Sequence, residues 1–122
     1  MNANKSVTAV FVATGGQTVR YQWLMDTNPG WTKSPSTTAN KWAWGTATGG
    51  GGQHGAHDPT SGHTGTSVYG YNLTGDYANS IPEHSLTTTA INCTGLTQCK
   101  LRFWRWLGVE QPAYDHAYVR VS

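Results

Sequence analysis

The stretch Thr18-Val-Arg-Tyr-Gln-Trp-Leu-Met25 decides the fold class. Val19, Tyr21, Trp23 and Met25 occupy every second position in it. Side chains at alternate positions share one face of an extended chain, so this pattern predicts a half-buried β-strand and not a helix.

The same period of two recurs along the chain, interrupted by clusters of Gly, Pro, Asn and Asp that predict turns. Seven strands are expected, near residues 6–13, 17–25, 41–46, 66–72, 84–90, 97–107 and 114–122. The connection from residue 46 to residue 65 holds seven glycines among twenty residues and is the longest expected loop. Short strands at this spacing predict an all-β fold, a β-sandwich or jelly roll of antiparallel strands with a long Gly-rich loop.

Composition narrows the function classes. The 122 residues include 18 Thr, 15 Gly and 8 Ser, but only 18 Leu, Ile, Val and Phe together. Six Trp and six Tyr must therefore supply a small aromatic core. Charged residues are 11% and the net charge is +2, so neither a coiled coil nor a nucleic-acid partner is expected. No apolar run approaches the ~18 residues of a membrane helix, so no membrane partner is expected either.

The domain organisation is read from a change in composition near residue 25. Residues 1–25 form plain N-terminal strands, which we interpret as the tail of a preceding repeat. Residues 26–122 carry the Trp- and Gly-rich module, and the whole chain is expected to make one compact domain.

Four stretches together resemble a known family: Asp58–Tyr77, Leu86–Gly95, Leu101–Leu107 and Tyr114–Ser122. In order and content they are similar to the jelly-roll accessory modules, MAM-like or concanavalin-like, of large secreted bacterial proteins. The resemblance implies an extracellular, non-catalytic module that binds carbohydrate or a cell surface and is often stabilised by calcium. Such modules continue beyond the last of these strands, so the resemblance also implies a truncated piece.

An oxygen-rich set of side chains is the first candidate site. Calcium takes six to eight oxygen ligands, many of them from flexible Gly-rich loops. With the resemblance, the expected calcium ligands are Asp58, Thr60, Asn72, Asp76 and Asp115. The competing interpretation is a side-chain-capped turn at Asp58 and ordinary surface carboxylates elsewhere.

The Gly-rich loop also contains His54, His57 and His63. Imidazole is a common ligand of zinc and copper, so these three predict an alternative transition-metal site. An open coordination position there would make the chain a small metal-dependent enzyme. Polar loop histidines without a metal are the simpler interpretation.

Aromatic and polar side chains near the C-terminus form the third candidate site. By alternation Arg102, Trp104 and Trp106 share one side of their strand, and His116 and Tyr118 share one side of theirs. If these strands are neighbours, the rings line one sheet face, where Trp and Tyr stack on the C–H faces of sugars. The competing interpretation places the tryptophans in the core.

Cys93 and Cys99 are the only cysteines, and a disulfide between them would close a short loop worth about 2 kcal/mol in the chain-entropy model. The alternative is two reduced thiols.

The alternation of Ala117, Val119 and Val121 demands an apolar cover, which predicts a homodimer or higher homo-oligomer. The leading hypothesis is a secreted polysaccharide-binding module with a structural calcium.

Overall fold

The structure is a computed structural model that describes residues 10–13, 18–53 and 55–122. This part of the chain contains seven strands and no helix, which confirms the all-β fold. The strands are β1 Val10–Ala13, β2 Thr18–Gln22, β3 Thr32–Ser34, β4 Trp42–Thr46, β5 Ser67–Tyr71, β6 Ser85–Thr87 and β7 Lys100–Arg102.

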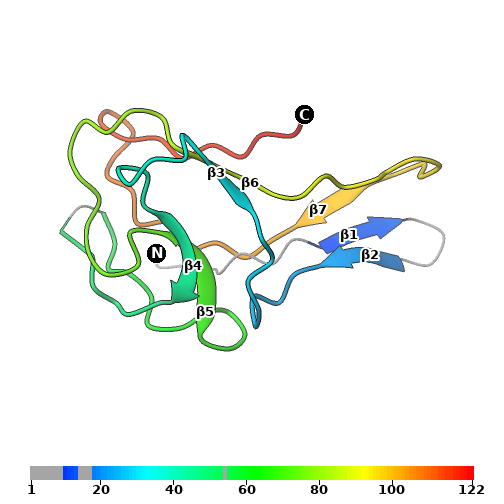
Figure 1. Cartoon of the computed structure of the whole chain (residues 1–122), viewed down its shortest axis with the longest axis horizontal. Helices are drawn as coiled ribbons and strands as arrows, with labels where there is room; N and C mark the ends of the chain where they lie inside the picture. The colour runs from blue at the N-terminus through cyan, green and yellow to red at the C-terminus, as the bar shows by residue number, and fades with distance from the viewer. Residues whose placement is uncertain (1–9, 14–17, 54) are drawn as a thin grey trace.

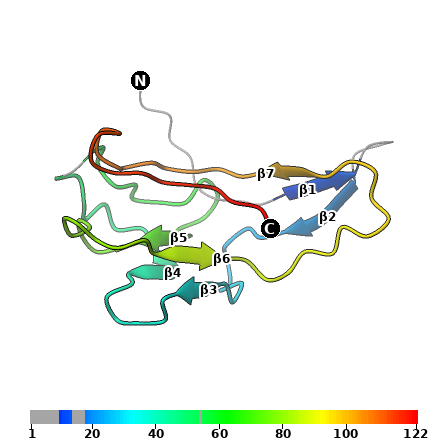
Figure 2. The same cartoon turned by 90° about the horizontal axis from the view of Figure 1, so that it is seen from above.

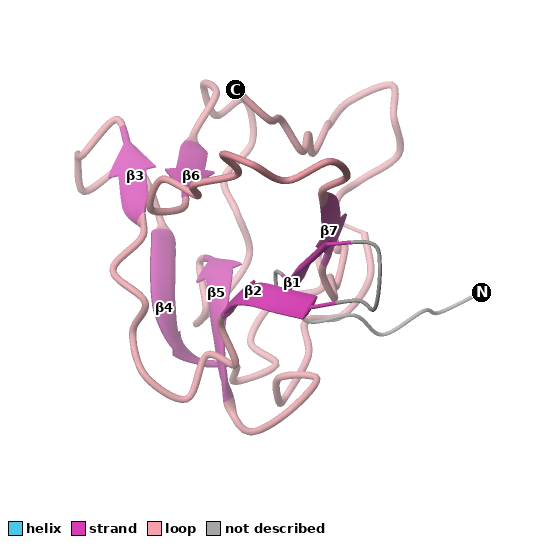
Figure 3. Ribbon diagram, turned by 90° about the vertical axis from the view of Figure 1, so that its right-hand side faces the viewer, coloured by secondary structure: helices cyan, strands magenta, loops and turns pink. Residues whose placement is uncertain are grey.

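The strands form three small antiparallel sheets, ordered β2–β1–β7, β3–β6 and β4–β5. The β2–β1–β7 sheet lies toward one end of the long axis, β3–β6 lies near the middle and β4–β5 lies farther from that end (Figure 1). Seen along that axis, β3 and β4 lie on one side and β1 and β7 on the other (Figure 3). The connections before and after β5 extend beyond β4 and β5, whereas the connection from β6 to β7 extends toward the opposite end (Figure 2). Loops therefore make up much of the molecule beyond β4 and β5.

The β2–β1–β7 sheet joins the two ends of the sequence. Val10 pairs with Gln22 on one side and with Arg102 on the other. The segment up to residue 25 thus shares a sheet with the segment that follows it.

The β4–β5 pair is the most regular one, with Trp42 opposite Tyr71 and Trp44 opposite Tyr69. Aromatic and β-branched side chains suit such cross-strand positions. Gly45 and Gly70 lie under the side chain of Leu73, and a Cβ at Gly45 would stand 3.0 Å from Leu73 Cδ1. The two glycines leave the room that Leu73 fills.

The core is small, as the composition predicts. Its buried apolar side chains in the described part are Met25, Ala47 and Val68. Asn40 is completely buried, and its amide donates to the Pro35 carbonyl at 3.0 Å and accepts from the Trp42 N–H at 3.1 Å. A buried amide with these partners fixes the entry into β4.

Other aromatic rings pack on one another instead of on aliphatic side chains. Trp31 stacks on Tyr69 with 5.0 Å between ring centroids, and Trp23 meets Trp31 edge to face at 5.5 Å. Tyr21 stacks on Trp23 at 6.2 Å. This row of four rings connects β2 to β5.

The structure corrects several predicted strands. Residues 114–122 form no strand, and the strands expected near 97–107 and 84–90 shrink to the three residues of β7 and β6. Alternating side chains indicate an extended backbone, but a strand also needs a hydrogen-bonded neighbour. β3 was not predicted, and residues 6–9 of the first expected strand lie outside the described residues.

Candidate functional site

The Gly-rich loop is organised by an aspartate. The backbone N–H groups of Gly52 and Gln53 both donate to Oδ1 of Asp76, at 2.8 and 2.9 Å. The Gly49 N–H donates to the Pro59 carbonyl at 3.0 Å. These bonds hold the glycine segment, residues 49–52, against the turn that follows β5.

Asp58 approaches the same segment from the other side. The Gly51 N–H hydrogen-bonds to its carboxylate, which works to lower the pKa of Asp58. Burial has the larger effect and raises that pKa, and the negative charge of Asp76 raises it further. Two carboxylates therefore stand near each other across the glycine segment.

The packing explains why the segment consists of glycines. A Cβ at Gly50 would stand 2.6 Å from the Thr74 carbonyl oxygen, and one at Gly51 would overlap the Asp58 carboxylate. A Cβ at Gly55 would stand 2.5 Å from the Val109 carbonyl oxygen. Close approach of neighbouring backbone requires glycine at Gly50 and Gly55, whereas the atoms next to Gly51 belong to the Asp58 side chain.

The other predicted calcium ligands have separate partners. The Asn72 amide donates to the backbone carbonyl of Asp76, so it helps to fix the same turn. Thr60 is exposed, and its methyl group lies against Gly49. Asp58, Thr60 and Asp76 thus border the glycine segment, and Asn72 contacts it only through the Asp76 turn.

Asp115 is held by a tyrosine. The Tyr77 hydroxyl donates to Oδ2 of Asp115 at 2.7 Å and accepts from the Glu110 N–H at 3.0 Å. Burial, followed by the bond to Asp115, raises the pKa of Tyr77 to about 12. Asp115 therefore fastens the 110–115 turn to the end of the Asp76 turn.

Within the described residues, no group of three or more His, Cys, Asp and Glu side chains is placed to hold a metal ion. His54 lies outside the described residues. His57 lies beside Gly52, whereas the ring of His63 stacks on Trp104. The structure therefore shows no transition-metal centre among the histidines it describes.

Trp104, one of the candidate binding residues, stacks on the ring of His63. The centroids are 3.9 Å apart and the planes differ by 10°. Trp104 remains 43% exposed. Arg102, the last residue of β7, is also exposed, but Trp106 is half-buried. The strand β7 ends at Arg102. Exposed side chains still occupy alternate positions as far as Trp104, but the expected alternation fails at Trp106.

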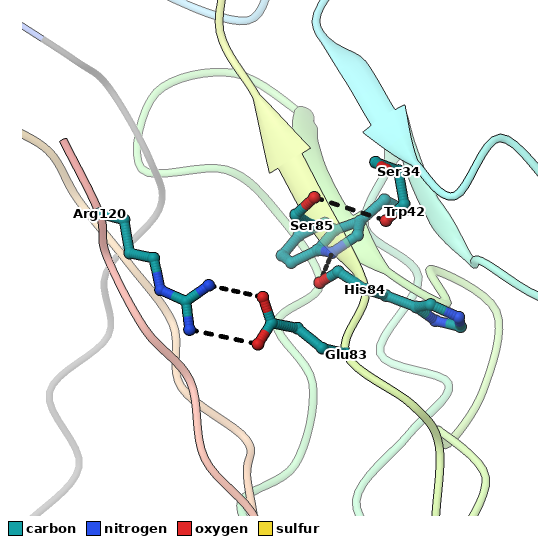
Figure 4. A network of polar contacts seen from close by, with 6 residues as sticks. All are labelled: Ser34, Trp42, Glu83, His84, Ser85 and Arg120. Carbon is teal, nitrogen blue, oxygen red and sulfur yellow. Dashed lines mark hydrogen bonds and ion pairs between the residues drawn. The ribbon is translucent and has the colours of Figure 1, made fainter. Parts of the chain in front are cut away.

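Tyr118 belongs to a second exposed stack. His116 lies parallel to it with 5.7 Å between centroids, and the Arg120 guanidinium lies 5.2 Å from its centroid. Arg120 in turn pairs with Glu83 through contacts of 2.5 and 3.2 Å (Figure 4). His116, Tyr118 and Arg120 share one side of the 114–122 segment, as their alternation predicts.

The two exposed stacks do not share a sheet face. β7 pairs with β1, and residues 114–122 form no strand beside it. The prediction of a single aromatic sheet face is therefore wrong, because its second strand has no ladder. Sequence reasoning also missed the contact between His63 and Trp104, since no local pattern links positions so far apart.

Cys93 and Cys99 are free, exposed thiols in the structure. A hydrogen bond from one thiol to the other raises the pKa of Cys99. The Leu96 N–H donates to the Cys93 carbonyl at 3.1 Å and closes the turn between them. The predicted disulfide stays a prediction for an oxidising compartment.

No protein-family model, curated protein or solved structure matches the chain. Across the described residues, no helix has the length and apolar character needed to span a membrane.

Proposed function

We propose that this chain is a non-catalytic, secreted module that binds carbohydrate through exposed aromatic side chains. The observation that supports this most is the pair of exposed stacks, in which Trp104 and Tyr118 are 43% and 65% exposed. Each ring lies against a histidine that helps to set its orientation. Orienting an exposed ring before binding lowers the entropy lost when a ligand is bound.

The chemistry around these rings suits a neutral, hydroxyl-rich ligand. A sugar offers an apolar C–H face to an aromatic ring and hydroxyl groups to polar neighbours. Arg102 lies two residues before Trp104, and His116 and Arg120 flank Tyr118. Imidazole and guanidinium groups both donate to hydroxyl oxygens.

A structural calcium is part of the proposal. Asp58 and Asp76 offer only oxygen donors, which fits a hard cation, and a divalent ion would offset their mutual repulsion. With two carboxylates at the glycine segment, the remaining ligands would be amide, hydroxyl, carbonyl and water oxygens. Such an ion would stabilise the loop and has no chemical role in binding.

A homodimer or higher homo-oligomer is also proposed, because Val119 and Val121 are 59% and 87% exposed. Pairing such apolar surfaces between copies would remove them from water. Light scattering should give a mass above one chain at micromolar concentration. A stable monomer over that range would contradict this part of the proposal.

The binding proposal is tested by depletion from solution with insoluble polysaccharides: cellulose, chitin, xylan and peptidoglycan. We expect retention on at least one, and loss of retention in Trp104→Ala and Tyr118→Ala. Tyr114→Ala is the matched control, because Tyr114 is 67% exposed and lies outside both stacks. Retention on none of the four, or equal loss in all three variants, would contradict the proposal.

A further inference from the structure

A cavity of about 260 Å³ lies where β2 ends. Its lining is nearly continuous in sequence: Gln22, Trp23, Leu24, Met25, Asp26, Thr27 and Pro29. The volume is just below the ~300 Å³ at which pockets for drug-sized ligands begin. The cavity therefore suits a single small ring and not an extended ligand.

The backbone around this cavity is held in an unusual conformation. Met25 has a φ of 67°, in the left-handed region that side chains rarely adopt, and its side chain is buried. The Trp44 indole N–H donates to the Met25 carbonyl at 2.9 Å. Strained residues that are fixed by their surroundings are concentrated at binding sites.

The far end of the lining is anchored as well. The Asn28 side chain accepts from the Gly30 N–H and from the Tyr69 hydroxyl, both at 2.9 Å. The Trp31 N–H donates to the same hydroxyl at 3.1 Å. The loop is thus tied to β4 and β5, so its shape does not depend on a ligand.

An aromatic side chain forms part of the lining. Trp23 is half-buried. It meets Trp31 edge to face and lies parallel to Tyr21 with 6.2 Å between ring centroids, so its ring is supported from within the protein. The indole Nε1 of Trp31 is buried and has no hydrogen-bond partner within the described part of the chain. A buried donor without a partner one ring contact away from a cavity is an unusual feature in a folded protein.

The polar part of the lining combines an amide, a carboxylate and a hydroxyl, from Gln22, Asp26 and Thr27. All three residues are exposed. An aromatic ring beside neutral and anionic hydrogen-bonding groups recognises a ligand that has an apolar face and several hydroxyls. A phosphorylated ligand would find no basic residue in this lining.

We propose that this cavity binds one sugar ring of a glycan. Trp23 contacts the C–H face of the ring, and Gln22, Asp26 and Thr27 bind its hydroxyls. The site shares its ligand class with the proposed function but none of its residues. The two can therefore fail separately.

The test follows the indole N–H resonances of ¹⁵N-labelled protein, assigned with single Trp→Phe variants. The probes are glucose, galactose and N-acetylglucosamine, followed by cellohexaose, xylohexaose and chitohexaose. We expect at least one probe to shift the Trp23 or Trp31 resonance saturably. Gln22→Ala and Asp26→Ala should each raise the Kd at least fivefold, while the exposed-amide control Gln111→Ala should leave it unchanged.

The proposal is overturned if none of the six probes at millimolar concentration shifts the Trp23 or the Trp31 resonance. A response of the Trp104 resonance alone does not change this conclusion. The proposal is also overturned if the shifts persist with unchanged Kd in both cavity variants. A response at Trp23 without one at Trp104 would support the cavity, while the proposed function is decided separately by retention on the insoluble polysaccharides. If Asp26→Ala loses a folded spectrum, Gln22→Ala and the conservative Asp26→Asn carry the same comparison.

Discussion

The glycine segment and the C-terminal segment, residues 103–122, use their polar groups in opposite ways. Around the glycine segment, Oδ1 of Asp76 accepts two backbone N–H groups, and added side-chain atoms would collide with neighbouring backbone or side chains. In the C-terminal segment, large rings are exposed, and an ion pair that is itself exposed joins it to Glu83. The first region holds a shape, and the second leaves large rings exposed to solvent.

Filling the position of the glycine segment that lies closest to neighbouring backbone should cause a large loss of stability. Gly50→Ala places a Cβ 2.6 Å from the Thr74 carbonyl oxygen, so backbone must move, and we expect a loss of about 1–3 kcal/mol in the free energy of unfolding. The matched control is Gly75→Ala, whose Cβ would stand 3.7 Å from its nearest neighbour, the Asn72 amide nitrogen. Urea unfolding should show the control within about 1 kcal/mol of wild type. Equal losses in both would show that the segment is not tightly packed.

Removing an exposed ring should separate binding from stability. We expect Trp104→Ala to weaken polysaccharide binding at least tenfold, about 1.4 kcal/mol, with little change in unfolding. Trp44→Ala removes a half-buried ring and its bond to the Met25 carbonyl, so it should cost about 3 kcal/mol of stability. Binding isotherms and urea unfolding on both variants measure the contrast. A large stability loss in Trp104→Ala would place that ring in the core.

Neutralising one of the paired carboxylates should have a smaller effect, with a sign that depends on calcium. The pKa of Asp58 is raised, so the folded protein disfavours the charged form of this carboxyl. The resulting loss of stability is absent below the ordinary pKa of 3.8. It develops as the pH rises through the raised pKa of the folded protein. In chelator at pH 7, Asp58→Asn should therefore unfold at the same temperature as wild type or slightly higher. In excess calcium only wild type should gain stability. A gain of the same size in the variant would exclude Asp58 as a ligand.

The smallest effect is expected from the Arg120–Glu83 pair, since both side chains are largely exposed. The hydrogen bond from Arg120 holds the pKa of Glu83 below its ordinary value of 4.5. The stabilisation is therefore present above pH 4.5 and is lost as pH falls through the lowered pKa. Thermal unfolding between pH 3 and 7 should show a shallower slope for Arg120→Gln than for Arg105→Gln, and the difference should shrink in high salt.

The sequence predicts some of these features better than others. β4 and β5 were predicted to within a residue, because Trp42, Trp44, Tyr69 and Tyr71 alternate between clear turn signals. β3 was missed because three polar residues before a proline carry no alternation. Tyr118 shows the reverse case: its alternation is real, but no partner strand follows from it.

The candidate sites also contain some features that the sequence predicts and others that it does not. The family resemblance implied that Asp58 and Asp76 belong to one oxygen-rich set, and both side chains lie at the glycine segment. Nothing local indicated that Tyr77 binds Asp115 or that His63 stacks on Trp104. Such pairs depend on the path of the loops, which composition and periodicity do not encode.

The position of β1 between β2 and β7 has a consequence for folding kinetics. The β1–β7 pairing joins Val10 to Arg102, so nearly the whole chain must be closed into a loop before it forms. The β1–β2 and β4–β5 pairs join strands that are much closer in sequence and can form earlier. The β7 edge is therefore expected to assemble last, and its amides should exchange with solvent deuterium sooner than those of β4 and β5. A protease acting during refolding would accordingly find the segment between Thr87 and Lys100 accessible for longest.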